Sequence, residues 1–362
     1  MRWPWQRTGS SDRLVVSWSG QTLAYVLARA RADGTHAVLK FGVEHQGSDG
    51  VEDLLHRLQA LGLKGLEACV MLRPEQYQLL QIDTPAVAPE ELRSAARYQI
   101  REMLHTHVDD VTLDVMRVGD GKQKGQGHLF VMVVPNALVR NILGLGESLH
   151  WTVPVIDVQE TAQRNLQNAL AARDGRPERA NAALVLVQGQ QALLTISANE
   201  ELFYTRRFEL PPEFLAGSWE QGSDHAPPLN SGFAPVDEYV PDYSVDGISY
   251  GTDYSDPRAG GSDAPGVGAG EDESSQRFLV EVQRSLDVWE RSWSSMPLDR
   301  LWVYAGDRSR ELSAWLALQL GQKVVPLDVN ALFPGFEAGT AADQARCLPL
   351  LGVLMRSESR KL

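Results

Sequence analysis

The sequence predicts an α/β protein of two lobes that are related to each other by internal duplication. Three consecutive strand patterns open the chain, and the same arrangement returns in its second half. Each set of three strands is followed by alternating helix and strand patterns, which is typical of layered α/β folds. The length of 362 residues also exceeds one ordinary core, because domains average roughly 150 residues.

The first lobe begins with three strands connected by tight turns. Ser19-Gly20 and Asp33-Gly34 are turn signals between segments of alternating apolar residues. Apolar residues at helical spacing follow, and then a fourth apolar strand. The predicted elements of this unit are strands at 14–18, 21–29 and 35–44, a helix at 51–61 and a strand at 67–72.

A smaller unit follows the fourth strand. Its first segment alternates like a strand, its helix carries Glu90 and Glu91 in the first turn, and a strand pair is joined by a Gly/Lys loop. A further amphipathic helix and a short buried strand complete the first half. The predicted elements are strands at 77–83, 111–118, 128–134 and 153–157, and helices at 89–104 and 136–149.

The second lobe repeats the opening pattern of the first. Gly189 and Asn199-Glu200 mark the turns between its three strands. Helical periodicity precedes these strands and returns after a long polar segment. The predicted strands lie at 182–187, 191–198, 201–208 and 301–305, and the helices at 160–173, 276–293 and 307–320.

One segment carries nearly all of the net charge of −13. Between Glu220 and Glu273 there are twelve acidic residues and one basic residue, Arg258, so this stretch accounts for −11. It is rich in Gly, Ser, Pro and Asp and shows no apolar period, which predicts a disordered acidic insertion at 217–275. Four tyrosines among the acids leave an interaction tract as the alternative to a solvated linker. The nearly neutral lobes indicate that nucleic acid is not a partner.

Membrane insertion and export are not predicted. No segment approaches the roughly 20 apolar residues that span a bilayer, and the first seven residues lack the apolar core of a signal peptide. Cys69 and Cys347 stand far apart with no neighbouring metal-ligand pattern, so buried reduced thiols are expected. These features predict a cytoplasmic location.

Four stretches, in order, resemble the PilM family, particularly its MshI-like branch from the mannose-sensitive haemagglutinin pilus system. This family belongs to the actin, Hsp70 and sugar-kinase superfamily. The stretches are Ile82-Asp83-Thr84-Pro85 with Pro89-Glu90-Glu91-Leu92 and Ala95-Ala96-Arg97-Tyr98, then Val155-Ile156-Asp157 with Ala162 and Arg164, then 278–287, and 349–356.

The resemblance implies an actin-like fold of two duplicated ribonuclease-H-like lobes, with a small α+β subdomain inserted in the first. It implies a flexible N-terminus at 1–11, a first lobe at 12–157 with the subdomain at 76–135, and a second lobe at 158–357. The acidic insertion at 217–275 then falls within the second lobe.

The resemblance also implies a nucleotide site, but its phosphate turns lack their acidic residues. The first turn, with Ser17, Ser19 and Gly20, keeps small polar residues without a carboxylate, and the second keeps only Gly189. The adenosine-side motif survives as Ala305-Gly306. Without an Asp at either turn, Mg²⁺ lacks an evident protein ligand, so the sequence predicts ATP binding without turnover or an empty cleft.

His105-Thr106-His107 has the residue types of a metal site. The run follows a predicted helix C-terminus, where histidine is favoured electrostatically, so a capped helix end is the preferred interpretation and no metal is predicted.

The resemblance implies a scaffold that binds the N-terminal cytoplasmic tail of a PilN-like inner-membrane subunit. The protein would then associate with the inner face of the inner membrane through that partner, in a pilus or type II secretion-like platform. The side chains predicted to line the groove are Leu79, Leu80, Leu92, Tyr98 and Met103. The alternatives are an active ATP-dependent small-molecule kinase or ATPase of the same fold, and the cytoplasmic domain of a type II secretion subunit.

Overall fold

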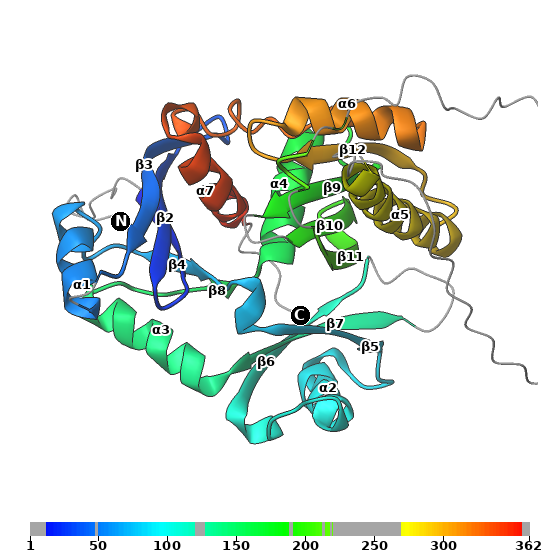
Figure 1. Ribbon diagram of the computed structural model, residues 1–362. Helices are drawn as coiled ribbons and strands as arrows, with labels where there is room; N and C mark the ends of the chain where they lie inside the picture. Colours follow the sequence, from blue (N-terminus) through cyan, green and yellow to red (C-terminus); the bar gives the residue numbers. More distant parts are fainter. Residues whose placement is uncertain are drawn as a thin grey trace, which may run out of the picture.

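The computed structural model describes residues 12–47, 50–119, 127–187, 191–211, 214–217, 219 and 269–356. The predicted N-terminal segment 1–11 and most of the predicted insertion lie outside these ranges. The strands of the described part form two five-stranded sheets and one three-stranded sheet (Figure 1).

The two larger sheets have the same topology. Sheet 1 has the order β3-β2-β1-β4-β8, and sheet 2 has the order β11-β10-β9-β12-β13. In each, the first three strands are antiparallel and the last two join in parallel. The common order is the duplication that the repeated strand pattern predicts. The strands are β1 Asp12–Trp18, β2 Thr22–Ala30, β3 His36–His45, β4 Ala68–Met71, β8 Ile156–Asp157, β9 Ala180–Val187, β10 Gln191–Ala198, β11 Glu201–Glu209, β12 Leu298–Tyr304 and β13 Val324–Pro326.

The small sheet, of order β5-β7-β6, follows β4 in the chain and is covered on one face by helix α2 (Leu92–Gln99). Its strands are β5 Gln78–Asp83, β6 Val111–Arg117 and β7 His128–Pro135. The predicted helix at 89–104 is divided, because 3₁₀ turns at Pro89–Glu91 and Ile100–Glu102 flank α2. Leu92, Ala96 and Ile100 are buried against alternate residues of β6 and β7, which gives this unit its own core.

Helices cover both faces of sheet 1. Alternate residues of β1, such as Leu14 and Val16, face α1 (Val51–Ala60) and α3 (Asn136–Ser148), whereas Val15 faces the opposite side. Helix α7 (Ala341–Leu354) packs on that opposite side, although it comes from the end of the chain. Sheet 1 is therefore completed by a helix that follows all the strands of sheet 2 in the chain (Figure 1).

Sheet 2 is enclosed by α5 (Ala269–Ser292) and α6 (Ser309–Leu320) on one face and by α4 (Gln159–Arg173) on the other (Figure 1). Helix α4 also packs along α7, so these two helices form the junction of the lobes. Gly352 of α7 allows their close approach: a Cβ atom there would lie 1.9 Å from the carbonyl oxygen of Ala162.

Two parts of the predicted insertion are ordered. Helix α5 begins at Ala269, inside the segment predicted to be disordered, and the acidic residues 271–273 of the sequence favour a helix start. Trp219 is buried in the core of sheet 2, with the Arg308 guanidinium 3.8 Å from its ring centroid. Gly-rich composition at the two ends of the predicted insertion thus hid a buried aromatic residue and the start of a helix.

Candidate functional site: a cleft beside the small sheet

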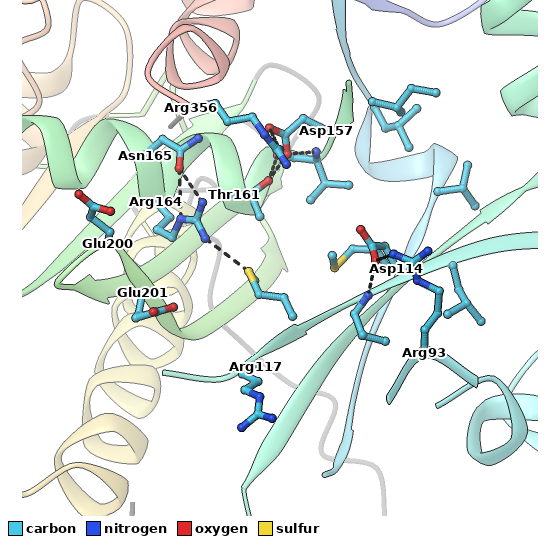
Figure 2. A pocket seen from close by; sticks show the side chains of 18 of the residues that line it. Arg93, Asp114, Arg117, Asp157, Thr161, Arg164, Asn165, Glu200, Glu201 and Arg356 are labelled. Carbon is cyan, nitrogen blue, oxygen red and sulfur yellow. Dashed lines mark hydrogen bonds and ion pairs between the residues drawn. The ribbon is translucent and has the colours of Figure 1, made fainter. Parts of the chain in front are cut away.

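A cleft of about 1230 Å³ lies between the small sheet and helix α4 (Figure 2). This volume exceeds the range of roughly 300–1,000 Å³ that is usual for small-molecule sites, and its elongated lining draws on three parts of the fold. Strand β6 forms one side, α4 forms the other, and the end of α7 contributes Met355 and Arg356.

The cleft has an apolar floor and a polar helical wall. The floor is made of apolar side chains from β4, β7, α3 and β8 and their neighbours: Leu72, Met132, Val134, Val139 and Ile156. The wall is one face of α4, where positions three and four apart lie together. Its members are Thr161, Asn165, Asn168, Ala169 and Ala172. Apolar side chains and polar groups of one ligand can therefore be accommodated together.

Strand β6 turns its unpaired main-chain edge toward the cleft. Among the residues that the structure describes, β6 pairs with β7 alone. Six consecutive residues, 112–117, line the cleft, whereas a strand that presented one face would contribute every second residue. The Val115 N–H bonds to a side chain and the Val111 carbonyl oxygen accepts from Arg97, so neither group bonds to β7. Alternation along an antiparallel ladder then directs the main-chain groups of Leu113 and Arg117 to the same open edge.

Asp157 fixes the junction of β8, α4 and α7 at one end of the cleft. Its buried carboxylate accepts hydrogen bonds from the Val158 N–H at 2.8 Å and from the Thr161 hydroxyl. Arg356 donates to its second oxygen at 2.8 Å. This arrangement ties the start of α4 to the end of α7, as Figure 2 shows.

A second buried cluster joins the small sheet to the second lobe. The Tyr77 hydroxyl, just before β5, bonds to the Glu160 carboxylate on α4, and Arg207 of β11 bonds to both groups. The pKa of Tyr77 is raised well above its ordinary value, mainly by burial and secondly by the negative charge of Glu160. The phenol therefore stays protonated and serves as a hydrogen-bond donor between the lobes.

The described members of the predicted nucleotide site do not line this cleft and lie at strand ends of the two large sheets. Ser17 is buried in β1, and the Ser19 hydroxyl is engaged within its own turn, accepting from the Thr22 N–H at 3.0 Å. Gly20 has φ +89°, which suits the tight turn between β1 and β2. The turn thus holds its own hydroxyl and offers no carboxylate, so its residues do not fit a magnesium–phosphate complex.

The adenosine-side motif forms a tight turn between β12 and α6. Gly306 has φ +60°, and the Ala305 N–H donates to the Ser309 hydroxyl at 2.9 Å. Gly189, the third predicted element of the site, lies outside the described residues.

The predicted groove residues are dispersed over the small subdomain. Leu92 lines the cleft, but its side chain is buried in the core under the small sheet. Leu79 and Leu80 are partly buried on β5, and neither lines the cleft. Tyr98 is 80% exposed and Met103 is 47% exposed, both outside the cleft lining. The structure therefore does not bring these five side chains together.

The main features of the cleft were not found from the sequence. Helix α4 has many polar residues, which ordinarily indicate an exposed helix. Gln163 and Gln167 are nevertheless buried and donate to carbonyl oxygens of β9, and Asn165 is buried and donates to the carbonyl oxygen of Gly352 in α7. A sequence signal for this burial exists, because α4 lacks a charged face and carries polar amides on nearly every side. The open edge of β6 had no sequence signal at all.

No group of three or more metal-ligating side chains is assembled in the part of the chain that the structure describes. The predicted helix-end histidine, His107, begins a 3₁₀ turn, where its ring accepts from the Asp109 N–H at 3.4 Å. Among the same residues, no helix is both long and apolar enough to span a bilayer.

The chain is similar in sequence to a secretion-system protein and in fold to a pilus biogenesis complex. No protein-family model matches the chain. Type II secretion system protein L of Xanthomonas campestris pv. campestris is 27% identical over 159 residues. The match covers 44% of this chain and 40% of that protein, so the chain spans well under half of its length.

Solved structures share the fold over nearly the whole chain. A PilM-PilN type IV pilus biogenesis complex matches with a TM-score of 0.58 and 14% identity, covering 95% of this chain and 97% of the other. A Bacteroides thetaiotaomicron protein with an actin-like ATPase fold matches with a TM-score of 0.47 and 8% identity, covering 96% and 97%. The chain therefore shares its two-lobe α/β fold with the PilM-PilN structure, and the predicted likeness to PilM is confirmed at the level of the fold.

Proposed function

We propose that this protein is a cytoplasmic scaffold of a type IV pilus or type II secretion-like assembly platform. It binds the N-terminal cytoplasmic tail of a PilN-like membrane subunit in the cleft between β6 and α4. The observation that carries the proposal is the open edge of β6 above an apolar floor. An extended peptide that adds to such an edge gains main-chain hydrogen bonds, while its alternate side chains enter the floor.

The similar proteins support this proposed function. The similar solved structure is a complex of PilM with PilN, and the curated relative is a type II secretion protein. On this proposal the protein lies at the inner face of the inner membrane and is held there by its partner. The mannose-sensitive haemagglutinin (MSHA) pilus is the particular system that the sequence motifs favour.

We further propose that nucleotide turnover plays no part in this function. The described phosphate turn contains no carboxylate and its serine is satisfied internally, which supports a degenerate site. The alternative is an ATP-dependent kinase or ATPase, which requires magnesium-dependent phosphate transfer. Sustained ATP turnover by the purified protein would favour that alternative.

The binding proposal is tested by blocking the cleft without disturbing the core. Asn168 is half-buried on the α4 wall, so Asn168→Trp places an indole in the space that a peptide would use. We expect a synthetic peptide of the PilN-like subunit's cytoplasmic tail to bind the wild type and to bind this variant at least tenfold more weakly, by isothermal titration calorimetry.

Gln319→Trp is the matched control, because Gln319 is an exposed amide side chain on α6 and does not line the cleft. It is expected to bind like the wild type. Failure of the folded wild type to bind the peptide would refute the proposed function. Equal binding by the Asn168→Trp variant would place the peptide elsewhere on the molecule.

A further inference from the structure

We propose that the Asp114 carboxylate is a displaceable cap on the open edge of β6, which an entering strand must push aside. The inference rests on the proposed function, because it concerns how the same cleft is closed when no partner is present. Asp114 lies in the middle of the strand segment that lines the cleft (Figure 2).

The cap is defined by two hydrogen bonds to one oxygen. Asp114 Oδ1 accepts from the main-chain N–H of Val115 at 3.0 Å and from Nη2 of Arg93 at 2.7 Å. Arg93 lies on α2, which packs beside β6, so the carboxylate is held between the strand edge and the helix. Figure 2 shows both bonds meeting at Asp114.

The carboxylate occupies the place of a strand partner. Val115 is 3% exposed, so its N–H would be costly to leave without an acceptor. An added strand would present a carbonyl oxygen to this N–H, and the carboxylate and the carbonyl cannot both occupy the same position. Binding along β6 therefore requires Asp114 to move away.

The cap is weakly held, which suits displacement. The side chains of Arg93 and Asp114 are 62% and 59% exposed, and ion pairs this exposed contribute little net stability. Water can also hydrate both charges after they separate. An incoming strand thus replaces a modest interaction by a main-chain ladder.

The main-chain groups at the start of β6 are held more firmly than those at Val115. Arg97 donates to the carbonyl oxygens of Val108 at 2.6 Å and Val111 at 3.2 Å, and its side chain is less exposed than that of Arg93. The displaceable part of the edge is therefore 113–117. This length limits the added strand to about five residues.

A capped edge also explains how the empty protein avoids pairing with other chains. Exposed strand edges promote association, and charged side chains on the edge are a common protection. Asp114 supplies that charge and satisfies the N–H at the same time. The cap accordingly favours the partner over adventitious strands, because only a segment that also fits the apolar floor gains enough to displace it.

The first test needs no partner. In the free protein, we expect the Val115 amide proton to exchange with solvent at least threefold faster in Asp114→Ala than in the wild type, as measured by hydrogen exchange with NMR detection. Glu102→Ala is the matched control, since Glu102 is an exposed carboxylate in the turn after α2 and does not line the cleft. It should leave the Val115 rate unchanged. An unchanged rate in Asp114→Ala would overturn the cap.

The second test uses a synthetic peptide of the cytoplasmic tail of the PilN-like subunit. We expect Asp114→Ala to bind it about three- to tenfold more tightly than the wild type and Glu102→Ala to bind it with wild-type affinity. If the wild type binds and Asp114→Ala binds equally or more weakly, the cap fails while the proposed function stands. If none of the three proteins binds, the proposed function fails, and the displacement step fails with it.

Discussion

Helix α4 serves two regions that are built in opposite ways. Toward α7 and sheet 2 it forms a dense junction, in which Gly352 lies directly over the backbone of Ala162 and buried amides bond to strand carbonyls. Toward β6 it forms the wall of an open cleft lined by Asn168 and Ala172. One helix is thus fully packed along one side and exposed to a binding space along another.

The contrast shows which part of the protein is rigid. Enzymes that close over a substrate need an element that moves, and hinges are drawn from loosely packed segments. The apolar core at the junction instead joins both lobes, with β1, α4 and α7 contributing to one cluster. The cleft has no such core, so variation in sequence should be tolerated there and penalised at the junction.

The largest expected effect is at the crossing of α4 and α7. A Cβ atom at Gly352 would lie 1.9 Å from the Ala162 carbonyl oxygen, so Gly352→Ala forces the helices apart. We expect a loss of about 3 kcal/mol or more in the free energy of unfolding, measured by urea titration.

Gly144→Ala provides the matched control. Gly144 lies inside α3, and a Cβ atom there would meet no heavy atom within 4 Å. Alanine should leave stability unchanged or raise it by up to about 1 kcal/mol, because glycine is unfavourable in a helix interior. If the two substitutions had similar effects, the junction would not be tightly packed.

An intermediate effect is expected at the cluster between the small sheet and the second lobe. Tyr77→Phe removes the hydroxyl that bonds to Glu160 and leaves that buried carboxylate with Arg207 alone, which should cost about 1–3 kcal/mol at neutral pH. The exposed Tyr98, substituted in the same way, should show no loss.

The same cluster predicts an alkaline dependence of stability. The pKa of Tyr77 is raised in the folded protein by burial and by Glu160, so above pH 10 the unfolded chain loses this proton while the folded protein keeps it. Stability therefore falls as the pH rises past 10. Tyr77→Phe should reduce the rate at which the free energy of unfolding falls with pH. Burial raises the pKa of Tyr304 to about 12, so Tyr304 should account for part of the pH dependence that remains. A slope equal to that of the wild type would contradict the role of Tyr77.

Much of the fold was predictable because its strands follow simple patterns. Alternation and turn residues located β1, β2 and β3 to within two residues at each end, and their return in the second half predicted the second sheet. Strand β13 was missed, since Val324–Pro326 is too short to show a period. Helix α4 was located, but its burial was not, because its polar side chains find their partners only in the folded junction.

The cleft could not be predicted for a related physical reason. Its lining comes from segments separated by more than 200 residues, such as Arg93 and Arg356, and an open strand edge is defined by what does not pair with it. The sequence predicts the groove from apolar and aromatic residues of the subdomain. Of these, Leu80 and Leu92 pack in the core of the subdomain, and Tyr98 is largely exposed to solvent.

The smallest expected effect is at the cleft, where Arg93→Ala removes the guanidinium that holds Asp114. Both side chains are mostly exposed, so the free energy of unfolding should change by no more than about 0.5 kcal/mol in the urea titration that serves for Gly352→Ala. A loss above about 1 kcal/mol would show that the rim of the cleft is part of the folded core. A negligible change would establish that the cleft is free to change its contacts at little cost to the fold, as a binding surface requires.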